Sequence, residues 1–149
     1  MSEINKIVRL SRCKSILVVE DEPSIRENLQ TLLEFEGYSV CTASNGEEGL
    51  RTLRTMRRPC LVLLDLLMPV MNGMEFLEAK SHVATIASIP VCIVSGVAEK
   101  PDMSQASVFL KKPIEFDGLL KIVRQHCGVP KSESVKLNRK KVAKNGKNK

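Results

Sequence analysis

Short apolar runs alternate with amphipathic stretches between residues 15 and 127 of the chain. Five of the runs predict β-strands, at residues 15–19, 38–43, 60–64, 91–94 and 107–110. The first, third and fourth runs are apolar throughout, as strands covered on both faces must be, so we place them at the middle of a parallel sheet. This alternation of strand and helix signals is typical of an α/β fold.

Helix signals fill most of the gaps between the predicted strands. Pro23 opens the first helix, whose apolar residues recur at helical spacing until Gly37. Two Asn and Glu pairs have the spacing of capping boxes and predict the starts of the second and third helices: Asn45 with Glu48, and Asn72 with Glu75. The last helix is predicted by an apolar stripe at Phe116, Leu119, Leu120, Val123 and Cys127, which Gly128 closes.

The gap between the fourth and fifth strands differs from the others. Residues 96–106 include Gly96 and Pro101 and offer little room for a crossover helix, since such a connection usually takes a dozen or more residues. Asp102 and Gln105 have the spacing to cap a single turn at most. We therefore predict that the fourth helix is shortened or missing.

The length of 149 residues suits one domain, which we place at residues 14–129, between an N-terminal extension at 1–13 and a tail at 130–149. No apolar run approaches the roughly 20 residues that cross a bilayer. The first 14 residues lack the continuous apolar core of a secretory signal. We expect a cytoplasmic protein without membrane insertion.

The formal net charge of +6 comes from the tail. Residues 131–149 contain eight basic residues and one acidic residue, a net charge of +7, whereas residues 1–130 carry a net charge of −1. The tail has too few apolar residues to offset the entropy of ordering, and we predict that it is disordered. One alternative function is binding of nucleic acid or another anionic surface through this tail. Without interleaved aromatic residues, such binding would be non-specific and salt-sensitive.

The five cysteines are odd in number and widely spaced, without a C-x-x-C pair or a metal-ligand pattern: Cys13, Cys41, Cys60, Cys92 and Cys127. Several of them fall in or beside apolar runs, where cysteine often serves as a small core residue. We predict that most are buried free thiols, in agreement with a reducing compartment.

Acidic residues follow two of the predicted central strands. Glu20 and Asp21 come directly after the first strand, and Asp65 comes after the third. The carboxyl ends of parallel strands share one edge of the sheet, where open α/β sheets bind their ligands. Carboxylates about 5 Å apart repel by roughly 3 kcal/mol per pair at an effective dielectric constant near 20. A hard divalent cation relieves this repulsion, and a site with few carboxylates and room for phosphate suits Mg²⁺.

Two further polar groups reach the same edge. Ser95 follows the fourth predicted strand, and the pair Lys111 and Lys112 follows the fifth. An aspartate beside Mg²⁺ can attack phosphorus to form an aspartyl phosphate, and Asp65 is the best candidate for that nucleophile. A lysine ammonium and a serine hydroxyl are suited to bind the phosphoryl oxygens, which are the roles we expect for Lys112 and Ser95.

These residues together resemble the receiver domain of two-component response regulators. The resemblance covers residues 14 to about 128 and rests on motifs in the expected order: Glu20-Asp21, Asp65-Leu66-Leu67-Met68-Pro69-Val70-Met71-Asn72-Gly73, Ser95-Gly96 and Phe109-Leu110-Lys111-Lys112-Pro113. It implies a doubly wound, five-stranded parallel sheet with the flavodoxin-like strand order 2-1-3-4-5.

The resemblance also assigns roles to individual residues. Asp65 matches the phosphoacceptor, and Asp21, Glu20 and the backbone carbonyl of Leu67 match the Mg²⁺ ligands, Glu20 acting largely through metal-bound water. The remaining matches are Lys112 for the phosphate-binding lysine, Ser95 for the switch hydroxyl and Phe109 for the switch aromatic residue.

The function implied is a phosphorylation-dependent signal. A sensor histidine kinase or histidine phosphotransfer protein would phosphorylate Asp65, and the change would be transmitted by binding a downstream protein. Only 21 residues remain after Gly128, so we expect no output domain. The protein would not be an enzyme but a phosphoacceptor that assists its own phosphorylation and dephosphorylation. Leu67 and Val97 offer no group to orient an attacking water, which predicts slow loss of the phosphate. The gap at 96–106 predicts an unusual output surface.

Other interpretations of the same residues stay open. Each site residue has a structural alternative, namely helix capping, turn formation or plain solvation. A phosphatase with an aspartyl nucleophile usually carries a second acid two residues later, where this chain has Leu67. A flavodoxin-like nucleotide site needs phosphate-binding donors after the first strand, where Glu20, Asp21 and Glu22 would repel phosphate. A phosphate-independent adaptor built on the same fold is the remaining alternative.

Overall fold

The computed structural model describes residues 14–130, so the predicted N-terminal extension and the predicted disorder of residues 131–149 lie outside the described residues. Five parallel strands form one sheet in the order β2-β1-β3-β4-β5. The strands are β1 (Ser15–Val19), β2 (Ser39–Ala43), β3 (Leu61–Leu64), β4 (Val91–Ser95) and β5 (Val108–Lys111). This order and the α/β class confirm the predicted fold.

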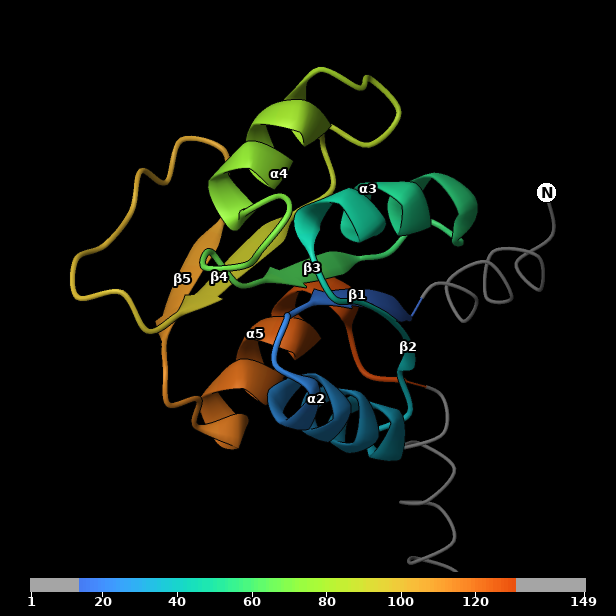
Figure 1. Cartoon of the computed structure of the whole chain (residues 1–149). Coiled ribbons are helices and arrows are strands. Elements are labelled where there is room, and N and C mark those ends of the chain that lie inside the picture. Colours follow the sequence, from blue (N-terminus) through green and yellow to red (C-terminus); the bar gives the residue numbers. More distant parts are fainter. Residues whose placement is uncertain (1–13, 131–149) are drawn as a thin grey trace, which may run out of the picture.

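Helices cover both faces of the sheet and make three layers (Figure 1). On one face lie α2 (Pro23–Phe35) and α5 (Phe116–Cys127), and on the other lie α3 (Gly46–Thr55) and α4 (Gly73–Ser81). Alternate residues of β1 enter the two apolar cores, with Ile16 and Val18 facing α2 and α5, and Leu17 and Val19 facing α3 and α4. No helix in residues 14–130 is long and apolar enough to cross a membrane.

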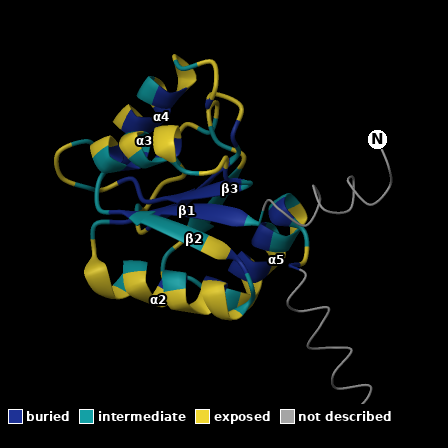
Figure 2. Ribbon diagram, turned by 90° about the vertical axis from the view of Figure 1, so that its right-hand side faces the viewer, coloured by how far each residue is buried: buried dark blue, intermediate teal, exposed yellow. Residues whose placement is uncertain are grey.

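Burial follows the position of each strand in the sheet (Figure 2). Every residue of β1, β3 and β4 is buried, because these strands have neighbours on both sides and helices on both faces. The edge strands β2 and β5 are more exposed, and β5 has no fully buried residue. Full burial of one leucine or valine side chain contributes about 1.5–3 kcal/mol, so the apolar central runs dominate the stability of the fold.

Only one of the two predicted capping boxes is complete. At α4 the Asn72 side chain accepts from the Glu75 amide, and the Glu75 side chain accepts from the Asn72 amide. At α3 the Asn45 side chain accepts from the Glu48 amide. The Glu48 carboxylate turns instead to the backbone and hydroxyl of Ser44. The prediction of a capping box at α3 was therefore right for Asn45 and wrong for Glu48. The Glu48 carboxylate accepts from the two donors of Ser44 instead of from the Asn45 amide.

The predicted loss of the fourth crossover helix is confirmed, because β4 connects to β5 without a helix. Asp102 accepts a hydrogen bond from the backbone of Ser104 (2.9 Å) and caps no helical turn with Gln105. The connecting segment, residues 96–107, instead sends Val97, Met103 and Ala106 onto the core that α3 and α4 cover. Three side chains of this segment thus cover apolar surface without forming a helix.

The prediction of mostly free cysteines is wrong for two of the five. Cys60 and Cys127 form a disulfide across 67 residues of sequence, with their Cα atoms 5.2 Å apart. Cys41 and Cys92 are free, and Cys13 lies outside the described residues. Spacing along the chain could not show the pair, because only the packing of α5 on the sheet brings its last residue beside the start of β3.

Candidate functional site

The carboxyl ends of β1 and β3 bring the predicted acidic residues together. Strand pairing continues past both strands, since the Glu20 amide donates to Ala43 and the Asp65 amide donates to Val19, each at 3.0 Å. Glu20, Asp21 and Asp65 form an acidic cluster in which one possible ligand atom of each residue lies within 4.8 Å of the others. Glu20 and Asp65 are buried, whereas Asp21 is partly exposed. The adjacency predicted from the strand ends is therefore confirmed.

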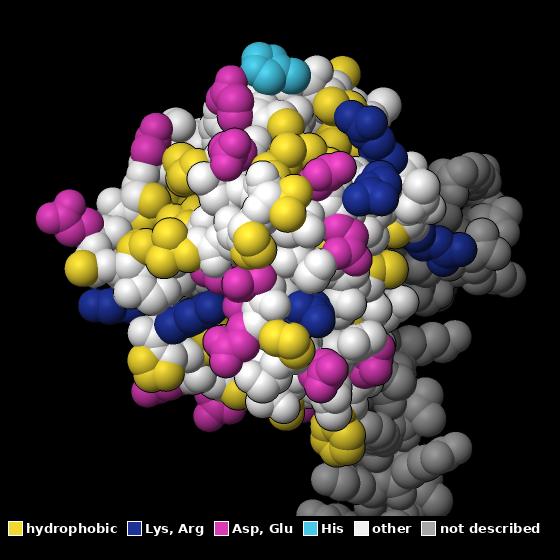
Figure 3. Space-filling model, in the orientation of Figure 1, with side chains coloured by type: hydrophobic (Ala, Val, Ile, Leu, Met, Phe, Trp, Pro, Cys, Tyr) yellow, Lys and Arg dark blue, Asp and Glu magenta, His cyan; other side chains and the backbone are white. Residues whose placement is uncertain are grey.

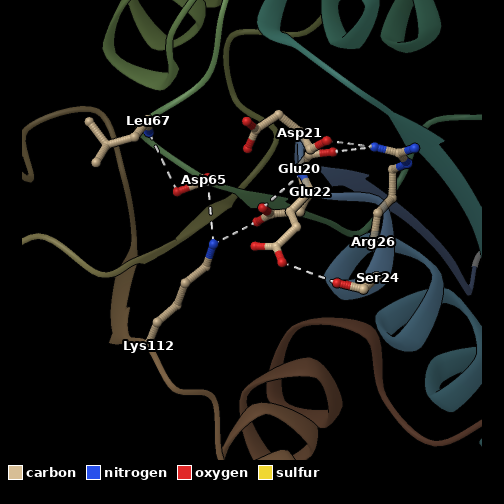
Figure 4. Close-up of polar contacts among 8 residues, drawn as sticks. All are labelled: Glu20, Asp21, Glu22, Ser24, Arg26, Asp65, Leu67 and Lys112. Atoms are coloured by element: carbon tan, nitrogen blue, oxygen red, sulfur yellow. Dashed lines mark hydrogen bonds and ion pairs between the residues drawn. The ribbon is translucent and has the colours of Figure 1, made fainter.

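The ammonium of Lys112 lies between two of these carboxylates (Figure 4). Its Nζ is 2.9 Å from Glu20 Oε2 and 3.5 Å from Asp65 Oδ2. The backbone amide of Lys112 donates to the carbonyl of Ser95 (2.9 Å), which fixes the lysine at the end of the β4–β5 pair. Its neighbour Lys111 is exposed, and the peptide bond from Lys112 to Pro113 is cis. Lys112, and not Lys111, is the lysine of the site.

Burial changes the protonation of the two inner acids. Desolvation raises the pKa of Asp65, and the nearby Asp21 charge adds to this effect against the opposing charge of Lys112. Desolvation likewise raises the pKa of Glu20, and the hydrogen bond from Lys112 only partly offsets it. When all three carboxyl groups of the cluster are ionised, Lys112 alone does not neutralise them.

The pKa of Lys112 shifts in the direction that keeps it charged. Burial alone would lower this pKa, but the hydrogen bond and the charge of Glu20, together with the charge of Asp65, outweigh burial and raise it. Lys112 is thus a fixed cation beside the carboxylate of Asp65. A fixed cation in this place stabilises anionic oxygens that arrive at Asp65.

The loop that follows β3 fits closely around Asp65. The Leu67 amide donates to Asp65 Oδ1 at 3.4 Å. Gly73 packs so tightly behind the loop that a Cβ there would lie 2.5 Å from the Asp65 carbonyl oxygen and 2.8 Å from the Leu66 Cα. Gly73 therefore has a specific reason to be glycine, which the sequence motif alone did not give. The role of the Leu67 carbonyl as a metal ligand stays a prediction.

Ser95 and Phe109 lie where the resemblance expects a switch. Ser95 is fully buried at the end of β4, and its hydroxyl makes no hydrogen bond within residues 14–130. A buried hydroxyl without a partner is destabilising by about 1–3 kcal/mol, so it would gain from an acceptor brought into the site. Phe109 is partly buried and packs on the core beneath α3 and α4. Their switching roles stay predictions.

Sequence reasoning missed Arg26, which faces the acidic cluster from α2. Its Nη1 donates to the carbonyl oxygens of Glu20 (2.9 Å) and Asp21 (3.2 Å) and so holds the turn that carries both acids (Figure 4). The one available signal was its position in the first turn of the helix that follows the acid pair. That signal is weak, because a basic residue on an exposed helix is common.

The donor set of the site fits Mg²⁺. The acidic cluster offers three carboxylates at one edge of the sheet, and hard oxygen donors are the ligands that Mg²⁺ prefers. Among His, Cys, Asp and Glu side chains of residues 14–130, this is the group close enough to hold a metal ion. Burial chiefly raises the pKa values of Asp65 and Glu20, so a bound cation would favour their ionised forms.

Comparison with known proteins agrees with this geometry. A family model described as the response regulator receiver domain matches residues 16–124. Response regulator Rre1 of Synechocystis sp. is 35% identical over 135 residues, which cover 83% of this chain and 58% of Rre1. Protein PilH of Pseudomonas aeruginosa is 33% identical over 113 residues, covering 72% of this chain and 93% of PilH. The chain thus spans nearly all of PilH but little more than half of Rre1.

Solved structures give the same result. The receiver domain of a signal transduction histidine kinase from Syntrophus aciditrophicus has a TM-score of 0.68 and 30% identity, covering 76% of this chain and 89% of that chain. Chemotaxis protein CheY4 of Vibrio cholerae has a TM-score of 0.69 and 29% identity, covering 76% of this chain and 98% of that chain.

Proposed function

The chain belongs to the response regulator receiver family, and from this premise we propose that it accepts a phosphoryl group on Asp65 from a histidine kinase or a histidine phosphotransfer protein. The observation that carries the proposal is the Lys112 ammonium, held 3.5 Å from the Asp65 carboxylate within the acidic cluster. We propose further that the protein is a cytoplasmic phosphoacceptor and not an enzyme acting on a separate substrate.

The chemistry assigned to Asp65 is a nucleophilic displacement. A carboxylate oxygen of Asp65 forms a bond to phosphorus while the bond from phosphorus to the donor imidazole nitrogen breaks, and the electron pair returns to the imidazole. Bound Mg²⁺, held by Glu20, Asp21, Asp65 and the Leu67 carbonyl, would supply neutralisation of charge on the transferring group. Once Asp65 is an acyl phosphate, the Lys112 ammonium loses its carboxylate partner there and pairs with a phosphoryl oxygen.

Ser95 distinguishes the phosphorylated protein from the unphosphorylated protein through one new hydrogen bond. Its buried hydroxyl is available to donate to a phosphoryl oxygen on Asp65, a hydrogen bond that the unphosphorylated site does not offer. Such a bond favours the conformation that makes it, and therefore shifts a two-state equilibrium. Movement of Ser95 toward Asp65 would free space into which Phe109 turns.

An apolar groove beside the site suits the phosphodonor. It has a volume of about 560 Å³ and is lined by Ile25, Asn28, Leu29, Leu32, Lys112, Pro113, Ile114 and Phe116. Because Lys112 belongs to both the groove and the site, a partner that fills the groove with apolar side chains brings its phosphohistidine toward Asp65. We propose this groove as the docking surface of the donor protein.

The output surface is proposed to lie over residues 96–107. Figure 3 shows hydrophobic side chains at the surface in this region and around α4. Met103 and Val97 are partly exposed here, and Leu67 and Val70, in the loop after Asp65, are mostly exposed, at 67% and 74%. A segment without a helix changes conformation at low cost, since few backbone hydrogen bonds need to break. We propose that a downstream protein recognises the rearranged segment.

The decisive experiment is phosphorylation by acetyl phosphate with Mg²⁺, measured as intact mass, beside Asp65→Asn and a sample with EDTA. A phosphoryl adduct in the wild type with Mg²⁺, absent from both controls, is the expected result. Fluoroberyllate binding provides an independent measure of the same site. Absence of both the adduct and fluoroberyllate binding would reject phosphorylation and leave the phosphate-independent adaptor as the function.

A further inference from the structure

The disulfide lies at the opposite end of the sheet from the acidic cluster. Cys60 directly precedes β3, whose other end leads into Asp65, and Cys127 is the last residue of α5. The two Cα atoms are 5.2 Å apart, within the range of about 4.4–6.8 Å that disulfides require. Cys60 is half-buried, whereas Cys127 is only 5% exposed. Cys60 is therefore the less buried of the two residues.

Non-covalent contacts hold the same end of α5 independently of the disulfide. The Tyr38 hydroxyl donates to the Gly128 carbonyl at 2.6 Å, and the Lys14 ammonium donates to the Cys127 carbonyl. One turn earlier, Arg124 pairs with Glu36 at 3.6 Å. These contacts come from the segment before β1 and from the connection between α2 and β2. They would keep the two cysteines side by side after the bond is reduced.

We propose that Cys60 and Cys127 are a reversible redox site that exchanges with a small-molecule disulfide of the glutathione class. This redox role goes beyond the proposed function and rests on the proposed cytoplasmic location. Disulfides in that compartment are usually transient and redox-sensing rather than structural. Nothing in the phosphorylation chemistry uses these two thiols, and they lie outside the acidic cluster.

The exchange balances with glutathione disulfide as the oxidant. The Cys60 thiolate attacks one glutathione sulfur, which forms a mixed disulfide and releases the first glutathione thiolate. The Cys127 thiolate then attacks the Cys60 sulfur and releases the second. Two protein thiols are oxidised, one glutathione disulfide is reduced to two glutathione molecules, and these take up the two thiol protons. We assign the first reaction to Cys60 because it is the less buried of the two residues.

The surroundings of the cysteines differ from one another. The Lys14 ammonium donates to the Cys127 carbonyl at the negative end of the α5 dipole, a favourable place for a cation. The two free cysteines of the described residues provide contrasts. Burial raises the pKa of Cys92 to about 12, so this thiol is unreactive. Cys41, half-buried in β2, is free and makes no disulfide in residues 14–130.

Oxidation would tie the start of the phosphoacceptor strand to the end of the last helix. The bond closes a loop of 67 residues, and a cross-link over a long loop restricts the unfolded chain strongly. We expect the oxidised protein to unfold at a temperature several degrees higher than the reduced protein. The non-covalent contacts at the end of α5 should keep the reduced protein folded.

The test equilibrates the full chain with mixtures of reduced and oxidised glutathione, traps free thiols by alkylation and maps them by peptide mass. Cys60 and Cys127 should lose alkylation together as the oxidised share rises, and regain it together under reductant. Cys60→Ser should abolish protection of Cys127, whereas Cys41→Ser, the matched control, should leave the pair unchanged.

Three outcomes would overturn the proposal: both cysteines alkylated at every glutathione ratio, a glutathione adduct that stays on Cys60 while Cys127 remains free, or a disulfide that resists excess reductant in the folded protein. The assay is repeated on Asp65→Asn. The exchange should persist in this variant, because the two cysteines lie at the other end of the sheet from Asp65. The redox proposal can therefore fail or succeed independently of the phosphorylation proposal.

Discussion

Replacing Asp65 by Asn should make the metal-free protein more stable. The substitution keeps the size of the side chain and an oxygen that can accept from the Leu67 amide, now at 3.4 Å. It removes one of three carboxylates whose ligand atoms lie within 4.8 Å of one another. The variant therefore tests directly whether the fold is strained by the charge of its own site.

The magnitude follows from the distances. At an effective dielectric constant near 20 and at the upper limit of 4.8 Å, each carboxylate repels Asp65 by about 3.5 kcal/mol. Lys112 at 3.5 Å attracts it by about 5 kcal/mol. Two repulsions against one attraction leave a net repulsion of about 2 kcal/mol, which solvent around the partly exposed Asp21 reduces. We expect Asp65→Asn to raise the free energy of unfolding by about 1–2 kcal/mol.

The pH dependence follows from the pKa shift. Burial raises the pKa of Asp65 above its ordinary value of 3.8, so between that value and the raised one the native state binds more protons than the unfolded state. The stability of the metal-free wild type must therefore fall as the pH rises through this interval. Glu20 contributes a fall of the same sign above 4.5. Asp65→Asn retains only the Glu20 part.

The assay is urea unfolding in EDTA from pH 4 to pH 8, repeated with millimolar Mg²⁺. Mg²⁺ should stabilise the wild type more than Asp65→Asn, because a ligand that binds only the native state stabilises it. Asp102→Asn is the control, since Asp102 lies outside the acidic cluster and asparagine keeps the acceptor for the Ser104 amide. A wild type as stable as Asp65→Asn in EDTA at neutral pH would refute the account of excess charge.

Three further predictions concern the loop after Asp65 and the output segment. Gly73→Ala should lower the free energy of unfolding in urea by about 1–3 kcal/mol, because its Cβ would lie 2.5 Å from the Asp65 carbonyl oxygen. Gly118→Ala is the control, since a Cβ there meets nothing within 4 Å and should not lower the free energy of unfolding. Leu67→Asn should speed loss of phosphate from Asp65, measured by intact mass over time, and an unchanged rate would remove this residue from the hydrolysis account. Residues 97–104 should exchange their amide hydrogens rapidly without phosphate, and strong protection there would contradict an adaptable output segment.

The sequence alone determined the elements and the edge of the site. Short, nearly continuous apolar runs that alternate with helix signals are typical of central strands in a covered parallel sheet, and this pattern identified β1, β3 and β4. Because parallel strands end at a common edge, acids that follow two of them had to meet. The short gap before β5 likewise excluded a full crossover helix, since crossover length is a property of the chain itself.

Only the tertiary structure decided which side chains pair across the sequence. Three contacts show this. Lys112 pairs with Glu20, and Cys60 forms a disulfide with Cys127, although each pair is far apart in sequence. Arg26 in α2 donates to the carbonyl oxygen of Glu20, which follows β1. Side-chain partners were unpredictable even between close neighbours. The Glu48 carboxylate accepts a hydrogen bond from Ser44 and not from the backbone amide of Asn45. The hydrophobic periodicity and the ends of the apolar runs predict where the backbone forms strands and helices. Side-chain partners depend on rotamers and distances, which are fixed only when the elements pack together.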